Sequence, residues 1–271
     1  MACVGKPFSL KQIENFYQKY SRNNPHAAGY ALVHNNSVLY NKKPGIGTNL
    51  FNQDKNQIAK VLPTTKLGLF HVRFATHGTS EDNRNNHPIF HSLNGKIKSM
   101  IIHNGIVTVD KNLPTDGQTD TEQILSYWDK EGPECLAKFS GSAAIVVVDC
   151  GKVYAYHHGA PLYYEQKDYG MYLHQSSEFH NKVVPKNVVF EVSSSGLTPV
   201  CSVEMRSSYR INYVCNSPRS TIMARPTNAD RDVFWNSYEE NDENANDVDL
   251  SLKSFYDKYG IKPSNYYEED E

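Results

Sequence analysis

Apolar residues recur along the first 195 residues with periods that predict a mixed order of helices and strands. Ser9 and Gln12 resemble a capping box, and the apolar positions that follow them recur at helical spacing, which predicts a helix over about residues 9–20. Thr119 is placed to cap a second helix, because Glu122 follows three residues later and Ile124, Leu125 and Trp128 then fall on one face.

The remaining segments predict strands joined by short turns. A further helix is expected near residues 53–61 and a short helical stretch at 134–139, and strands are expected at 27–33, 67–75, 100–103, 143–149, 152–157, 162–165 and 171–175. The last four strands are short and are divided by Gly, Asp and Pro, which is typical of an antiparallel meander.

The pattern weakens after about residue 195, so three parts are expected. Residues 1–195 would form one continuous domain, 196–236 a C-terminal extension, and 237–271 an acidic tail that is partly disordered, since it is rich in Asp, Glu and Asn.

Composition narrows the class of protein. A chain of 271 residues can bury one sizeable core, and its net charge of -2 gives no field that would gather nucleic acid. No apolar run reaches membrane-spanning length and no signal peptide is evident, so no membrane association and a cytoplasmic location are expected. The five cysteines are widely spaced and odd in number, which indicates free thiols in a reducing compartment.

Four segments carry candidate chemistry. Cys3 lies almost at the amino terminus, where an N-terminal residue can use its own α-amine as general base, although a buried structural cysteine is the simpler interpretation of Cys3 alone. Arg73 emerges from an apolar strand and could meet a carboxylate in bidentate fashion, or form an ion pair at a strand end. Asn104 and Gly105 place an amide donor beside a backbone N–H, which suits an oxyanion hole but is also a common turn pair. Asp120 could receive an ammonium group or simply favour a helix start.

Taken together and in order, these segments resemble the glutaminase domain of class II glutamine amidotransferases. HVRFATHG at 71–78, the Asn-x-His-Pro stretch at 85–88, HNG at 103–105, TDTE at 119–122 and the turn at 159–162 carry the resemblance, which spans roughly residues 3–180. It is closest to glucosamine-6-phosphate synthase and amidophosphoribosyltransferase. The resemblance implies an α+β fold, a four-layer αββα sandwich of two antiparallel sheets of the N-terminal-nucleophile hydrolase type.

The resemblance also implies roles for individual residues. Cys3 would attack the side-chain amide of L-glutamine, with Asn104 and Gly105 holding the oxyanion. Arg73 would bind the substrate carboxylate and Asp120 its ammonium. The same pocket would be lined by Thr76, His77 and Gly78. No cofactor is implied, and the histidine spacings match no metal motif.

The implied function is an amidotransferase subunit that hydrolyses glutamine and supplies ammonia to a separate synthetase or transferase. Two alternatives stay open, an amidohydrolase acting on a γ-glutamyl or other small amide, and a catalytically silent module that binds glutamine. The silent module is suggested by Ala2, because removal of Met1 alone leaves the Cys3 amine blocked. Activity through Cys3 requires that a Met-Ala dipeptide be removed, or that the alanine be foreign to the natural protein.

Overall fold

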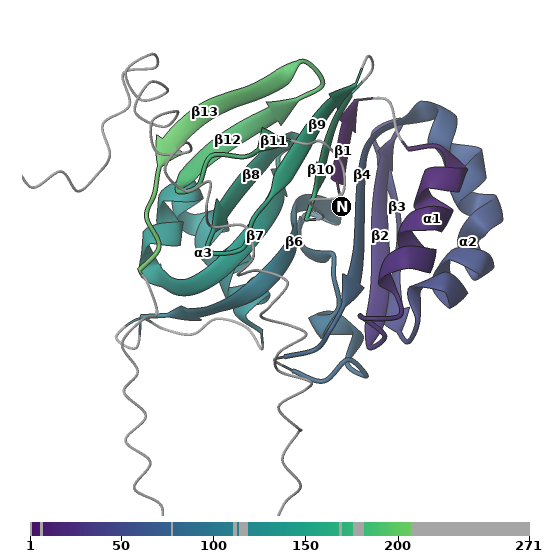
Figure 1. Ribbon diagram of the computed structural model, residues 1–271, viewed down its shortest axis with the longest axis horizontal. Helices are drawn as coiled ribbons and strands as arrows, with labels where there is room; N and C mark the ends of the chain where they lie inside the picture. The colour runs from purple at the N-terminus through teal and green to yellow at the C-terminus, as the bar shows by residue number, and fades with distance from the viewer. Residues whose placement is uncertain are drawn as a thin grey trace, which may run out of the picture. The chain divides into compact units, whose positions relative to one another are not determined.

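Two antiparallel sheets lie face to face at the centre of the protein (Figure 1). The computed structural model describes residues 2–5, 8–76, 78–110, 113, 119–167, 170–175 and 182–206. The first sheet has the strand order β11-β9-β10-β1-β4-β2-β3. Its strands are β1 (Ala2–Gly5), β2 (Ala27–His34), β3 (Ser37–Pro44), β4 (Thr65–Arg73), β9 (Tyr163–Lys167), β10 (Gly170–His174) and β11 (Lys182–Val183).

The second sheet has the order β13-β12-β8-β7-β6-β5. It is formed by β5 (Ile89–Leu93), β6 (Lys96–Val109), β7 (Phe139–Asp149), β8 (Lys152–His158), β12 (Val188–Ser193) and β13 (Gly196–Ser202). Every pairing between these named strands is antiparallel.

Helices cover the outer face of each sheet. The first sheet packs against α1 (Leu10–Tyr20) and α2 (Gly47–Val61), and the second against α3 (Asp120–Glu131) (Figure 1). Buried hydrogen bonds join these layers, since the Tyr17 hydroxyl of α1 donates to the Gly29 carbonyl over 3.0 Å and the Tyr30 hydroxyl donates to Asp54 of α2 over 2.9 Å. Short 3-10 helices lie at Leu62–Thr64, Asn83–Asn85 and Gly132–Lys138. The order helix, sheet, sheet, helix confirms the expected four-layer αββα sandwich.

Both predicted helix starts are confirmed in detail. Ser9 and Gln12 form the reciprocal bonds of a capping box at the start of α1, and the Thr119 hydroxyl accepts from the Glu122 N–H at the start of α3. The predicted strand at 100–103 is the centre of the longer β6, because pairing with both β5 and β7 extends its ladder over polar positions that local hydropathy does not single out.

The second sheet continues past residue 195, where the sequence pattern predicts the end of the domain. β13 pairs with β12, and Val203 and Met205 are buried in the same core as α3. The Tyr156 hydroxyl donates to the Val203 carbonyl over 3.0 Å, so this segment is part of the core rather than an appendage. The rest of the expected extension and the expected tail at 237–271 lie outside the described residues. Among the helices that the structure describes, none combines the length and the apolar character that crossing a bilayer requires.

Candidate functional site

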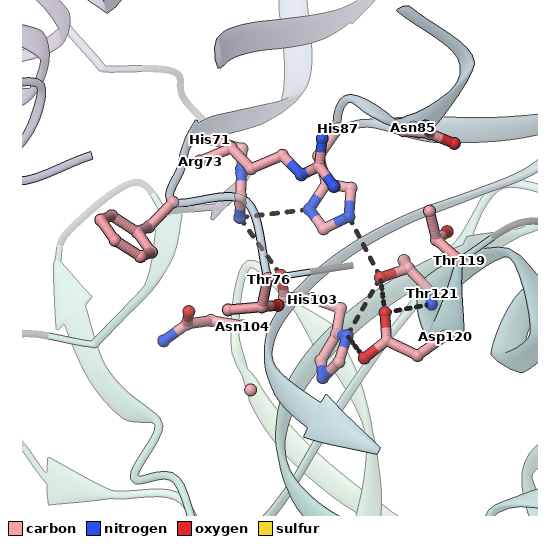
Figure 2. A pocket seen from close by; sticks show the side chains of 12 residues that line it. His71, Arg73, Thr76, Asn85, His87, His103, Asn104, Thr119, Asp120 and Thr121 are labelled. Atoms are coloured by element: carbon pink, nitrogen blue, oxygen red, sulfur yellow. Dashed lines mark hydrogen bonds and ion pairs between the residues drawn. The ribbon is translucent and has the colours of Figure 1, made fainter. Parts of the chain in front are cut away.

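A polar pocket lies where β4, β6 and the first turn of α3 meet (Figure 2), and its volume of about 380 Å³ includes space that is open to solvent. Five of the residues singled out in the sequence line it: Arg73, Thr76, Asn104, Gly105 and Asp120. Gly78 lies at its edge, with a backbone φ of +66°. His77 is outside the described residues.

Arg73 is held at the end of β4 by neutral acceptors. Its guanidinium donates to Asn86 Oδ1 over 2.9 Å and to the Gly78 carbonyl over 3.5 Å. Burial lowers the pKa of Arg73, and the nearby Asp120 carboxylate opposes that shift. An arginine titrates so far above neutrality that Arg73 stays a cation, and a carboxylate ligand would meet a partly desolvated positive charge.

Asp120 is fixed at the amino-terminal end of α3. Its carboxylate accepts from the Thr121 N–H over 2.8 Å and from the Val107 N–H of β6 over 3.2 Å. The partial positive charge of the helix start also stabilises a carboxylate at this position. Asp120 and Arg73 therefore present opposite charges to one small space, which suits the ammonium and carboxylate groups of an amino acid.

Asn104 and Gly105 lie side by side on β6, opposite Ala144 and Ala143 of β7. Gly105 has a φ of +132°, and a Cβ built on it would lie 2.0 Å from the Ser142 carbonyl oxygen. Only glycine fits so close an approach of β6 to β7. The role of Asn104 and Gly105 as an oxyanion hole stays a prediction.

Three histidines and Thr121, which line the same pocket, form a hydrogen-bonded network (Figure 2). His87 lies 3.1 Å from His71 and 3.1 Å from the Thr121 hydroxyl, and His103 Nδ1 lies 3.0 Å from the same hydroxyl. His71 Nε2 lies 3.2 Å from the backbone carbonyl of His103, the residue before Asn104.

Burial favours the neutral form of two of these histidines, His71 and His87. Burial lowers the pKa of His71 to about 3 and that of His87 well below its usual value. The sequence marked these histidines only by their nearness to the predicted site. Within the described residues, no group of His, Cys, Asp and Glu side chains is arranged to hold a metal ion.

The first strand separates Cys3 from this pocket. Ala2 lies on the inner face of the first sheet and lines a cavity that shares His71 and Asn104 with the polar pocket. Cys3 is fully buried in the core between the sheet and α1, next to Phe8 and Tyr172. Burial raises the pKa of the Cys3 thiol to about 12, and a hydrogen bond with Tyr172 only partly offsets that rise.

The structure therefore brings Arg73, Thr76, Asn104, Gly105 and Asp120 together and leaves Cys3 outside. Successive residues of a strand point to opposite faces, so the thiol can reach the pocket only if β1 shifts by one residue or turns over. The methyl group of Ala2 occupies the position from which a side chain of β1 would reach the pocket.

Comparison with solved structures finds this fold in an enzyme of known reaction. The chain is similar to glutamine phosphoribosylpyrophosphate (PRPP) amidotransferase from B. subtilis complexed with ADP and GMP, with a TM-score of 0.54 and 16% identity over 73% of this chain and 48% of that one. A structure described as the allosteric regulatory enzyme of purine biosynthesis gives a TM-score of 0.57 with the same identity and coverage. This chain thus spans about half the length of both structures. A glutamine aminotransferase class-II domain protein from Silicibacter pomeroyi gives a TM-score of 0.42 and 17% identity over 75% of this chain and 98% of that one.

The sequence itself matches no protein-family model and no curated protein. The fold assignment rests on the two structures with the higher TM-scores. The chain shares its fold with about half of glutamine PRPP amidotransferase, and this is the fold expected from the resemblance to class II glutamine amidotransferases.

Proposed function

We propose that the polar pocket binds the amino-acid end of L-glutamine, and that in this register of β1 the protein binds glutamine without forming a thioester. One observation carries the proposal, namely that Ala2 faces the cavity that adjoins the polar pocket, while Cys3 is buried on the opposite face of β1. Arg73 would pair with the α-carboxylate and Asp120 with the α-ammonium. Asn104 would bind the side-chain amide. The protein would then report or deliver glutamine rather than hydrolyse it.

A second candidate is the glutaminase itself, supplying ammonia to a separate acceptor enzyme. The pocket groups that this chemistry would need, Arg73, Asn104 and Asp120, all line one cavity, which favours this candidate. Cys3 would have to become the first residue by loss of Met1 and Ala2 and would also have to turn inward. The thiol would then attack the amide, ammonia would leave, and water would release glutamate from the thioester.

Two measurements on the full-length protein separate these candidates. Isothermal titration with L-glutamine tests binding, and intact mass after incubation with a glutamine-like diazoketone tests for an activated cysteine. We expect saturable binding and no adduct. An adduct on Cys3 together with glutamate release would favour the glutaminase. If L-glutamine does not bind and the diazoketone forms no adduct, both candidates are excluded.

A designed variant sharpens the test. Ala2→Cys combined with Cys3→Ala would place a thiol at the pocket-facing position, with its own α-amine exposed once Met1 is removed. We expect this variant to gain a diazoketone adduct that excess glutamine suppresses. The matched control, Cys3→Ala alone, should gain none.

A further inference from the structure

A second, largely apolar chamber adjoins the polar pocket, and its volume of about 310 Å³ includes space that is open to solvent. It shares His71, His103 and Asn104 with that pocket, so the two spaces meet along one wall. The rest of its lining consists of six aliphatic residues, Ala2, Ile102, Ala144, Val146, Leu162 and Leu173, and two polar residues, His174 and Gln175. An aliphatic chamber that continues a charged pocket is typical of a site for a ligand with one ionic and one apolar end.

The register of the two sheets explains why this space exists. Ala2 pairs with Leu173 and Leu69 in the first sheet, and Ala144 pairs with Asn104 in the second. Facing sheets pack about 10 Å apart, a distance that large side chains fill and that two alanines leave partly open. The chamber therefore depends on small side chains at positions 2 and 144.

The chamber and the pocket lie in line along two strands. On β4, Arg73 belongs to the polar pocket, His71 to both spaces, and Leu69 is the partner of the chamber residue Ala2. On β6, Gly105 belongs to the pocket, Asn104 to both spaces, and Ile102 to the chamber. The same order on both strands gives the combined site one axis, with Asn104 at its middle.

This axis is longer than glutamine. The four residue-to-residue steps of β4 from Arg73 to Leu69 span about 13 Å. The five bonds between the carboxylate carbon and the amide nitrogen of glutamine span about 6 Å when extended. A glutamine bound through Arg73 and Asp120 would bring its amide to Asn104 and leave the chamber beyond it empty.

We infer that the site takes γ-glutamyl amides whose amide nitrogen carries a small apolar group, and that this group occupies the chamber next to Ala2. The inference rests on the proposed function, because the glutamyl part uses the same Arg73 and Asp120. The carbonyl of the amide lies at Asn104, and the substituent points toward Ile102 and Val146. A charged substituent that reaches the aliphatic part of the chamber, beside Ala2, Ile102 and Val146, is disfavoured because those side chains offer it no partner.

The test compares ligands that differ only beyond the amide nitrogen. Titration calorimetry on the full-length protein would use L-glutamine, its N-propyl amide derivative (γ-glutamyl-propylamide) and γ-glutamylglycine, which carries a carboxylate into the chamber. Each buried methylene is worth about four-fold in Kd, so we expect propylamide to bind at least about ten-fold tighter than glutamine and γ-glutamylglycine to bind weaker than propylamide.

Two substitutions on β7 test the chamber, one by making it smaller and the other by making it larger. Ala144→Leu fills it and should bring the propylamide-to-glutamine affinity ratio close to one. Val146→Ala enlarges it and should raise the ratio for the longer butylamide. Thermal unfolding of each variant establishes that it is folded, and the enlarging variant keeps the test decisive where Ala144→Leu does not fold.

The outcomes are distinct. If glutamine binds and propylamide binds no tighter, the chamber is not a subsite and the inference is overturned, while the glutamine pocket stands. An unchanged affinity ratio in both variants would overturn the inference as well. If neither glutamine nor the propylamide binds, both the proposed function and this inference fail.

Discussion

The Arg73 guanidinium donates to the side-chain oxygen of Asn86 over 2.9 Å, so the cation of the pocket is oriented by a neutral amide. Asn86 is fully buried and its own amide nitrogen donates to the Ser80 carbonyl over 2.8 Å and to Asn83 over 3.0 Å. The segment between β4 and β5 thus fixes Arg73 before any ligand arrives, and a preformed cation loses little conformational freedom on binding.

Replacing Arg73 should weaken glutamine binding more than replacing its support. A charge-assisted hydrogen bond contributes about 1.5 to 3 kcal/mol, so Arg73→Lys should raise the glutamine Kd about 10- to 100-fold, and Asn86→Ala by less. Titration calorimetry measures both. Arg84→Lys is the matched control, because Arg84 is exposed and pairs with Asp82 alone among the described contacts. An Arg73→Lys variant with unchanged affinity would remove Arg73 from the proposed site.

Gly105 should tolerate no side chain. Gly105→Ala would place a Cβ 2.0 Å from the Ser142 oxygen at a φ of +132°. Overpacking and a left-handed backbone together predict a loss of about 2 to 5 kcal/mol in the free energy of unfolding. Urea unfolding measures the loss. Gly196→Ala is the control, since nothing lies within 4 Å of its Cβ position, and it should change stability little.

Because of His87, we expect the protein to be less stable in mild acid than at neutral pH. The pKa of His87 lies below the ordinary 6.5 because the ring is buried beside His71, His103, Arg73 and Lys42. The unfolded chain therefore binds a proton below about pH 6.5 that the folded protein does not bind, and stability is lost as the pH falls. The slope is about 1.4 kcal/mol per pH unit for one such histidine.

Unfolding in urea at pH 7, 6 and 5 checks this dependence. His87→Gln should flatten the slope between pH 6 and 5. His34→Gln, at the end of β2 opposite the pocket, should leave it unchanged. A His87→Gln slope equal to that of the parent protein would show that other groups carry the acid sensitivity.

Cys3 should matter for stability and not for glutamine binding. Cys3→Ala removes one fully buried sulfur from the core around Phe8 and Tyr172, which predicts a loss of about 1 kcal/mol. The glutamine Kd should stay within two-fold of the parent value. A large loss of binding with normal stability would indicate that Cys3 reaches the pocket in solution.

Helix caps are local signals that the sequence alone carries, while the layers of the fold followed from the resemblance that the short motifs carry. Five of the residues in those motifs line one pocket. Ser9, Thr119 and the segment around Asn104 could be interpreted from their neighbours alone. The face of β1 on which the Cys3 side chain lies could not be predicted from neighbouring residues. A strand of four residues with Ala and Cys as its first two gives no polar alternation from which to assign the inward face.

The histidine network escaped prediction for a different reason. His71, His87 and His103 are separated by 16 residues at each step, and their contacts depend on how β4, β6 and the turn before β5 pack together. No local sequence pattern encodes that packing. The spacing of the three histidines matched no known metal motif, but it did not indicate that they lie in one hydrogen-bonded network.

The position of β1 also sets an order of events during synthesis. Ala2 and Cys3 pair with both β4 and β10, so β1 completes its pairing only after residue 173 has been synthesised. Contacts between segments so distant in sequence form late. Until then Ala2 is not protected by the sheet, and afterwards it is fully buried. Any trimming that decides which residue begins the strand must therefore be finished while the chain is still being made or before it folds.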